Sequence, residues 1–92
     1  MEYAIKEIAR VIGAKTIQLL DDTVSLLLTD SRRLSFPEKS LFFALKTKTN
    51  DGHRYIQELY KLRVRNFVVS DMLPEFESMK DANFLIVKDT LR

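Results

Sequence analysis

Three short runs of consecutive apolar residues constrain the fold of this chain more than any other feature of its sequence. The runs cover residues 41–45, 67–69 and 84–87, and polar residues border each of them. An apolar run of this length without polar alternation is typical of a strand that is covered on both faces, as in a parallel sheet. The sequence therefore predicts buried strands over residues 41–45, 66–70 and 84–87.

Two segments with helical spacing alternate with these strands. Residues 5–12 place isoleucines on one stripe, and Gly13 follows where a helix end favours positive φ. Residues 52–62 repeat the pattern, and Pro74 suits the first turn of a short helix. Residues 23–29 favour one further strand, and Pro37 indicates a connection. The expected fold is α/β, with a small, mostly parallel or mixed sheet, two main helices and one short helix packed on it.

Composition limits the class of protein. The 92 residues fit one domain with a real core, since 46% are apolar and 30% are charged, and no internal repeat divides them. No cysteine is present, and the net charge is only +2. The sequence also lacks a 20-residue apolar stretch and a signal-peptide layout. We expect a cytoplasmic domain with no disulfide, no nucleic-acid partner and no membrane partner.

One polar loop is expected after the strand at 41–45. Lys46 and Lys48 supply cations there. Hydroxyl and amide groups that suit a ribose or a base edge come from Thr47, Thr49 and Asn50. Asp51 is placed to cap the helix that follows. In a parallel sheet, ligands bind beyond the carboxyl ends of the strands, so this loop suits a sugar-phosphate ligand. The alternative is a solvated loop with an Asp N-cap.

A second polar loop follows the strand at 23–29. Arg32 could hold a phosphate or a carboxylate in a bidentate fork, and Ser31 could donate to the same group. The alternative is a turn in which Asp30 and Ser31 bond to the backbone and Arg32 pairs with Asp30.

Catalytic and metal-binding signals are weak. His53 is the single histidine, and without cysteine or a second histidine we expect no metal site. The sequence contains neither a phosphate-binding P-loop nor a G-x-S-x-G elbow. The basic residues at 61, 63 and 65 complement a helix end without needing a nucleic-acid partner. We therefore expect no catalytic residue in this chain.

Four segments in order resemble the N-terminal domain of Mur ligases, the cytoplasmic ATP-dependent enzymes that build the peptidoglycan stem peptide. They are residues 29–32 (TDSR), 40–45 (SLFFAL), 50–56 (NDGHRYI) and 64–69 (VRNFVV). The resemblance covers nearly the whole chain. It is nearest to the members that add the third residue or D-alanyl-D-alanine, and most of all to the latter, including those fused to an alanine racemase.

The resemblance implies a division of labour. A domain of this kind binds the UDP end of UDP-N-acetylmuramoyl-peptide. A central domain, absent from this sequence, binds ATP and Mg²⁺ and forms an acyl-phosphate, and a C-terminal domain brings the incoming amino acid or dipeptide. The chain would then be a fragment of a longer ligase, cut at a domain junction near residue 92, with no cofactor of its own.

The resemblance also suggests roles for individual residues. The predicted substrate contacts are Thr29, Ser31, Arg32, Lys46, Lys48, Thr49 and Asn50, and the predicted loop-ordering residues are Asp30, Asp51 and His53. The resemblance leaves a structural alternative open for Arg32, which would tie the loop down. The sequence departs from the family pattern at Thr47, at Glu38 and Lys39, and at Arg63. Family members commonly have glycine at the place of Arg63. Because a non-glycine residue in a left-handed cap costs about 1 kcal/mol, we expect that turn to have a different shape.

The alternative function is a stand-alone α/β module that binds a protein partner through a strand edge or an apolar face. A large exposed apolar patch without a polar cleft would favour this alternative. Convergence of the two polar loops on one concavity would favour the nucleotide-sugar reading.

Overall fold

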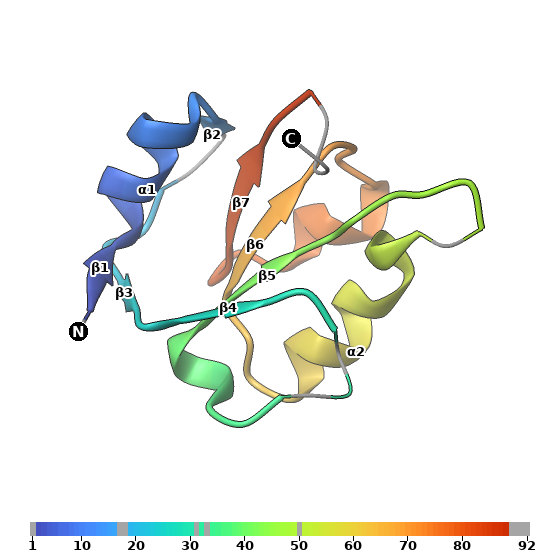
Figure 1. Cartoon of the computed structure of the whole chain (residues 1–92), viewed down its shortest axis with the longest axis horizontal. Coiled ribbons are helices and arrows are strands. Elements are labelled where there is room, and N and C mark those ends of the chain that lie inside the picture. The colour runs from blue at the N-terminus through green and yellow to red at the C-terminus, as the bar shows by residue number, and fades with distance from the viewer. Residues whose placement is uncertain (1, 17–18, 31, 33, 50, 89–92) are drawn as a thin grey trace.

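A mixed sheet forms the centre of the molecule. The structure is a computed structural model that describes residues 2–16, 19–30, 32, 34–49 and 51–88. In this part of the chain, five strands pair in the order β2 (Lys15–Thr16), β7 (Asn83–Ile86), β6 (Asn66–Val69), β5 (Ser40–Phe43) and β4 (Leu26–Leu28) (Figure 1). Neighbours among β4 to β7 are parallel, whereas β2 is antiparallel to β7. The predicted α/β class with a mostly parallel sheet is confirmed.

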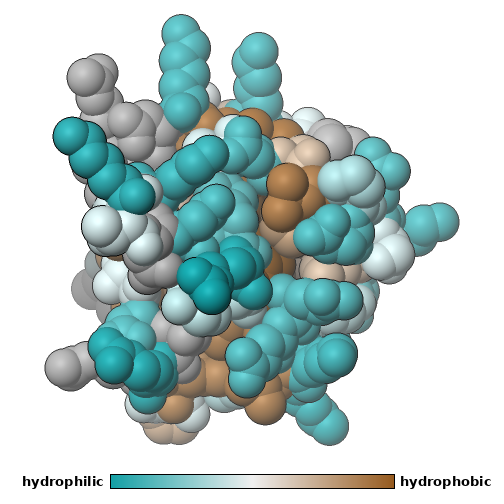
Figure 2. Space-filling model, turned by 90° about the vertical axis from the view of Figure 1, so that its right-hand side faces the viewer, coloured by the Kyte–Doolittle hydropathy of each residue, from teal (hydrophilic) through white to brown (hydrophobic). Residues whose placement is uncertain are grey.

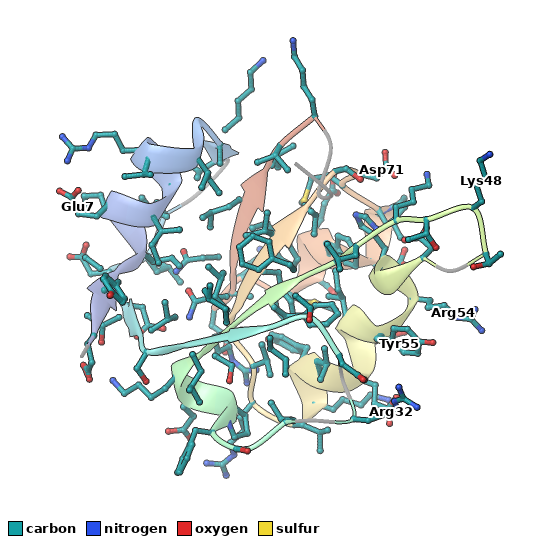
Figure 3. All side chains as sticks on the ribbon, viewed as in Figure 1. Glu7, Arg32, Lys48, Arg54, Tyr55 and Asp71 are labelled. Atoms are coloured by element: carbon teal, nitrogen blue, oxygen red, sulfur yellow. The ribbon has the colours of Figure 1, made fainter. Side chains whose placement is uncertain are left out.

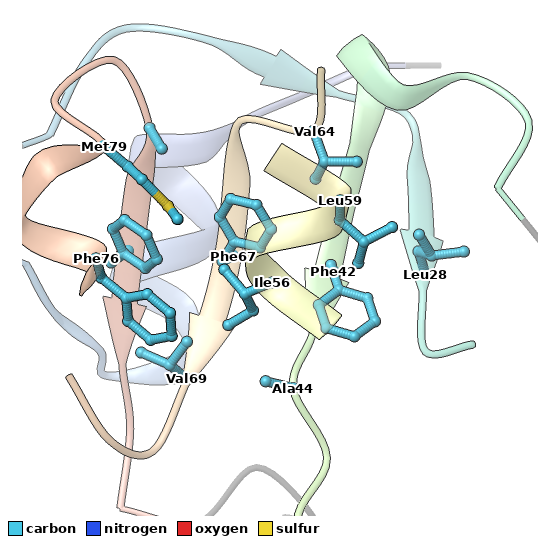
Figure 4. Packing of buried hydrophobic residues seen from close by; sticks show 12 residues of the cluster. Leu28, Phe42, Ala44, Ile56, Leu59, Val64, Phe67, Val69, Phe76 and Met79 are labelled. Carbon is cyan, nitrogen blue, oxygen red and sulfur yellow. The ribbon is translucent and has the colours of Figure 1, made fainter. Parts of the chain in front are cut away.

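The first face of the sheet carries the larger core. The helix α2 (Ile56–Lys61) and the 3₁₀ helix η4 (Pro74–Ser78) belong to this layer. Phe67 of β6 meets Phe42 edge-on at 6.4 Å between ring centroids and stacks on Phe84 at 5.3 Å. Phe76 of η4 extends the stack on the other side of Phe84 (Figure 4). Aromatic contacts therefore join three neighbouring strands to the helical layer.

The second face is covered by α1 (Ile5–Ile12). Ile5 and Ala9 of this helix pack with Leu41, Val68 and Leu85 of the sheet. The helix ends at Gly13, which has φ 68°, and the N–H of Ala14 donates to the carbonyl of Ala9. Both the bounds of this helix and its glycine stop agree with the sequence prediction. A small sheet of β1 (Tyr3–Ala4) and β3 (Thr23–Val24) lies beside it.

Three local predictions need correction. Residues 23–29 form two strands in different sheets, β3 and β4, because Ser25 turns its N–H to the carbonyl of Lys39. The second helical segment begins as a 3₁₀ helix, η3 (Gly52–Tyr55), and the segment after Pro74 is 3₁₀ throughout. The sequence predicts that the turn after α2 avoids the left-handed conformation. This prediction is wrong, because Arg63 has φ 80°.

Two asparagines form a buried polar pair where β6 and β7 begin. Asn66 and Asn83 are register partners, and the amide of Asn83 donates to the side-chain oxygen of Asn66 at 2.9 Å. Asn83 also exchanges two hydrogen bonds with the backbone of Leu20, and Asn66 donates to Asp22. These bonds hold residues 20–22 against the amino end of the sheet.

Candidate functional site

The two polar loops share one cleft at the carboxyl end of the sheet. The cleft has a volume of about 500 Å³, and its lining comprises Thr29, Asp30, Arg32, Phe42, Leu45, Thr47, Gly52 and Tyr55. The loop after β4 supplies one wall, and the segment from β5 into η3 supplies the other. Figure 2 faces this side of the molecule and shows a largely hydrophilic surface with small apolar areas between polar side chains. The convergence that the nucleotide-sugar reading requires is therefore present.

Arg32 is held by Asp30 at one side of the cleft. Its Nε and Nη2 donate to the two carboxylate oxygens of Asp30 at 3.1 and 3.0 Å, and its main-chain N–H donates to Asp30 Oδ1 at 3.0 Å. The hydrogen bond and the charge of Asp30 raise the pKa of Arg32 further above its ordinary value. Of the two interpretations of this loop, the geometry matches the turn in which Arg32 pairs with Asp30.

The loop after β5 returns on itself before it enters η3. Lys46 and Asp51 form an isolated antiparallel bridge, and the Lys46 ammonium pairs with Asp71 at 3.3 Å. Gly52 lies against the backbone of Ala44 and donates its N–H to the carbonyl of Leu45 at 2.7 Å. Lys46 is thus paired with Asp71 and is not among the lining residues of the cleft, and glycine stands where the two backbone segments touch.

The remaining predicted contacts are distributed unevenly. Thr29 lines the cleft, whereas Lys48 and Thr49 are exposed and are not among its lining residues. Figure 3 shows Lys48 at the tip of the loop, directed into solvent. Ser31 and Asn50 lie outside the described residues.

His53 connects this loop to the next one along the sheet. Its side chain is buried, and Nδ1 lies 2.6 Å from Asp51 Oδ1. Nε2 accepts hydrogen bonds from the main-chain N–H groups of Ser70 and Asp71, which follow β6, at 3.1 and 3.3 Å. Because Nε2 is an acceptor, the ring proton resides on Nδ1 and is donated to Asp51. These contacts give His53 a structural connection between loops.

Asp51 is an anionic cap in the same network. Burial alone would raise its pKa, but hydrogen bonds from the main-chain N–H and the ring of His53, with the charge of Lys46, hold the pKa of Asp51 below its ordinary value. The carboxylate is therefore ionised at neutral pH and already has partners within its own loop.

Sequence reasoning missed two residues beside the cleft, Arg54 and Tyr55. Tyr55 is half-buried and lines the cleft, and the guanidinium of Arg54 lies 5.6 Å from the centroid of its ring. The helical spacing of residues 52–62 places Tyr55 on the apolar side of the predicted helix and gives no sign of a cleft. The available signal was its position two residues after His53, at the start of that helix and next to the polar loop.

The described residues hold neither a metal-ligand cluster nor a membrane-spanning helix. Among the described residues, no group of three or more His, Asp or Glu side chains could hold a metal ion. No helix in this part of the chain is long and apolar enough to cross a membrane.

Two solved structures from one bacterium share this fold. The chain superposes on MurF from Acinetobacter baumannii with a TM-score of 0.80 and 18% identity, over 98% of this chain and 19% of that chain. It superposes on a UDP-N-acetylmuramoylalanyl-D-glutamyl-2,6-diaminopimelate–D-alanyl-D-alanyl ligase from the same organism with a TM-score of 0.81, at the same identity and coverage. No family model matches the chain, and no curated protein matches it either. At this identity the similarity establishes the fold, and the chain spans about a fifth of the proteins it matches.

Proposed function

We propose that this chain binds the UDP end of UDP-N-acetylmuramoyl-peptide as the N-terminal domain of a Mur ligase of the D-alanyl-D-alanine-adding type. In this proposal a longer cytoplasmic enzyme uses ATP and Mg²⁺ to make a peptidoglycan precursor, which serves cell shape and division. The central and C-terminal domains of that enzyme perform the bond-forming chemistry. The similarity of nearly the whole chain to one part of MurF structures supports this assignment.

The shared cleft is the observation that carries the proposal. A volume of about 500 Å³ is in the range of small-ligand sites. Thr29 and Thr47 bring hydroxyl groups, and Tyr55 brings an aromatic ring, while Phe42 and Leu45 add apolar surface. Hydroxyl groups suit ribose and base edges, and the ring suits contact with a base face. We assign polar contacts with the nucleotide to Thr29, and also to Ser31 and Asn50.

A titration followed by amide NMR tests the proposal. UDP and UDP-N-acetylmuramic acid are expected to shift resonances of residues 29–32 and 44–55 in a saturable way at millimolar concentrations. The variants Ser31→Ala and Asn50→Ala are expected to weaken binding. Shifts confined to α1 and β2, or no saturable shift, would contradict the proposal.

Exposed apolar side chains favour a second candidate, a protein-interaction module. Val11 on α1 is 79% exposed, Leu27 on the edge strand β4 is 69% exposed, and Phe36 is 65% exposed. A ligase fragment would also expose such residues where its other domains dock. The polar cleft favours the nucleotide-binding proposal. A titration in which UDP shifts no amide resonance would favour the protein-interaction module.

A further inference from the structure

Two arginines flank Tyr55, which lines the cleft; Arg32 is also a lining residue, whereas Arg54 is not. Figure 3 shows Arg32 and Arg54 on either side of this ring, all directed toward the same side of the molecule. Arg32 comes from the loop after β4, and Arg54 comes from η3. Both are exposed cations beside a cleft-lining residue, so either is positioned to meet an anionic part of a ligand.

The guanidinium of Arg32 is already engaged. Both oxygens of the Asp30 carboxylate accept from it, and Asp30 itself lines the cleft. A phosphate that approached Arg32 would have to displace a bidentate carboxylate and would meet its negative charge. The sequence-predicted cation is therefore a poor anion receptor.

Arg54 has a different environment. Among the described residues no carboxylate pairs with it, and its guanidinium lies near the ring of Tyr55. A cation–π contact can hold a guanidinium plane in place without using its N–H donors. Those donors consequently stay available for a phosphate fork.

We infer that Arg54, supported by Tyr55, supplies the cation that binds the diphosphate of a nucleoside-diphosphate ligand at this cleft, and that Asp30 keeps Arg32 out of this role. The inference rests on the proposed function. The inference adds Arg54 as a binding residue. Of the two roles predicted for Arg32, it keeps the structural one, in which Arg32 orders the loop after β4.

The test compares UDP, uridine and inorganic pyrophosphate on the wild-type chain and on matched Arg→Gln variants at low salt. The wild type is expected to bind UDP more tightly than uridine. Arg54→Gln is expected to lower UDP affinity about tenfold, the loss of roughly one charge-assisted hydrogen bond, and to leave uridine affinity unchanged. It should also weaken pyrophosphate binding and reduce the salt dependence of UDP binding. Arg32→Gln should have a clearly smaller effect.

Arg10→Gln is the control, because Arg10 is an exposed arginine that pairs with Glu7 and belongs to α1, the helix on the other side of the sheet from α2 (Figure 1). It should change nothing. Asp30→Asn in the Arg54→Gln background should recover part of the UDP affinity, because it removes the carboxylate charge that engages Arg32. A dispersed amide spectrum for each variant verifies folding.

The outcomes separate the two proposals. If the wild type binds UDP and Arg54→Gln binds it equally well, the role of Arg54 is overturned and the nucleotide-binding function stands. A larger loss with Arg32→Gln than with Arg54→Gln overturns it too, and absence of recovery with Asp30→Asn contradicts the role given to Asp30. If the wild type responds to neither UDP nor uridine, the proposed function fails and the inference fails with it.

Discussion

Arg63 holds a conformation that costs free energy for any residue with a Cβ. The N–H of Arg63 donates to the carbonyl of Tyr60, and the N–H of Val64 donates to the carbonyl of Leu59. These are the two hydrogen bonds of a Schellman motif, which needs a left-handed residue after the helix, and Arg63 supplies it at φ 80°. Val64 is buried in the first core beside Leu59, so the favourable burial of Val64 offsets the strain.

Arg63→Gly is expected to stabilise the chain by about 1 kcal/mol, since left-handed strain of about 1–2 kcal/mol is relieved and part of the gain is offset by the flexibility of glycine in the unfolded chain. Urea unfolding should show a higher midpoint with an unchanged m-value. Arg63→Ala is the control, because it removes only an exposed pairing with Glu38 at 3.4 Å. A Gly variant no more stable than the Ala variant would contradict the argument.

Glycine is required at position 52 because neighbouring backbone atoms leave no room for a Cβ, and not because of its φ angle. A Cβ at this position would lie 2.8 Å from the N of Leu45 and 3.0 Å from the backbone of Ala44. Gly52→Ala is therefore expected to destabilise the chain by about 1–3 kcal/mol, as overpacking does in cores. It should also shift the amide resonances of Ala44 and Leu45.

Gly13→Ala provides the comparison for this prediction. No atom lies within 4 Å of a Cβ there, but φ is +68°. This variant should lose about 1 kcal/mol through strain alone, with the resonances of residues 44–45 unmoved. Equal shifts in both variants would show that Gly52 has no special contact with the cleft backbone.

These residues differ in how well the sequence reveals them. Gly13 follows a periodic helical pattern, so its role as a stop could be predicted. Arg63 gives no such signal, because arginine does not favour positive φ. The contact between Asn66 and Asn83 also could not be predicted from the sequence, because only the register of β6 and β7 brings these two residues, 17 positions apart, together.

At the scale of elements, the buried strands were predictable and the edges were not. Continuous apolar runs identified β5, β6 and β7, because both of their faces meet a core. Residues 23–29 looked like one strand, yet Val24 packs in the second core and Leu28 in the first. Tertiary partners, which local propensity does not encode, divide this segment. The same limit applies to β1 and β2, which are two residues each.

The end of α2 is tied to the turn before β7 by a group of polar side chains. The Tyr60 hydroxyl donates to Asp81, and Arg65 lies over the Tyr60 ring at 4.1 Å while pairing with Asp81 at 3.0 Å. The hydrogen bond raises the pKa of Tyr60 and lowers the pKa of Asp81. The ionised carboxylate of Asp81 therefore stabilises the protonated hydroxyl of Tyr60, and that hydroxyl stabilises the ionised carboxylate.

Tyr60→Phe is expected to lower stability by at most about 1 kcal/mol near neutral pH, because Asp81 is 60% exposed and the bond is well solvated. The depressed pKa of Asp81 means that its contribution exists above about pH 3.9 and disappears as pH falls through the folded-state value. The raised pKa of Tyr60 means that its contribution exists below about pH 10 and disappears as pH rises through the folded-state value.

The free energy of unfolding in urea, measured from acid to alkaline pH, tests this prediction. The difference between the wild type and Tyr60→Phe should be largest in the middle of the range and should shrink at both ends. Tyr55→Phe is the control, because its hydroxyl has no hydrogen bond to a described residue, and its difference from the wild type should not vary in this way. A constant difference for Tyr60→Phe would contradict the coupling.

For the whole molecule, the location of the candidate site follows from topology. Strands β4, β5 and β6 run in parallel, so the segments that follow them emerge at one edge, which is why polar loops far apart in sequence share a cleft. That much could be predicted from the order of strands and helices. Which charged side chains are free to meet a ligand could not be predicted, because ion pairs decide it, as Lys46 with Asp71 and Arg32 with Asp30 demonstrate.

His53 is the side chain that holds two of these loops in register, so its effect should extend beyond its own position. Its Nδ1 meets Asp51, and its Nε2 accepts from Ser70 and Asp71. His53→Ala leaves two partly buried N–H donors without an acceptor and opens a cavity at a buried side chain, and should cost about 2–3 kcal/mol. Hydrogen exchange at the Ser70 and Asp71 amides should accelerate, and UDP affinity should fall even though His53 is not among the residues that line the cleft.

Two conservative variants separate the halves of this network. His53→Gln can place an oxygen near the position of Nε2 and should retain slow exchange at Ser70 and Asp71, whereas His53→Asn can only replace the Nδ1 donor and should not. If loop register controls the cleft, UDP affinity will follow amide protection across His53→Ala, His53→Asn and His53→Gln. Protection that changes while affinity stays constant would mean that the loop after β6 is independent of the site, and that the cleft depends on the loops after β4 and β5 alone.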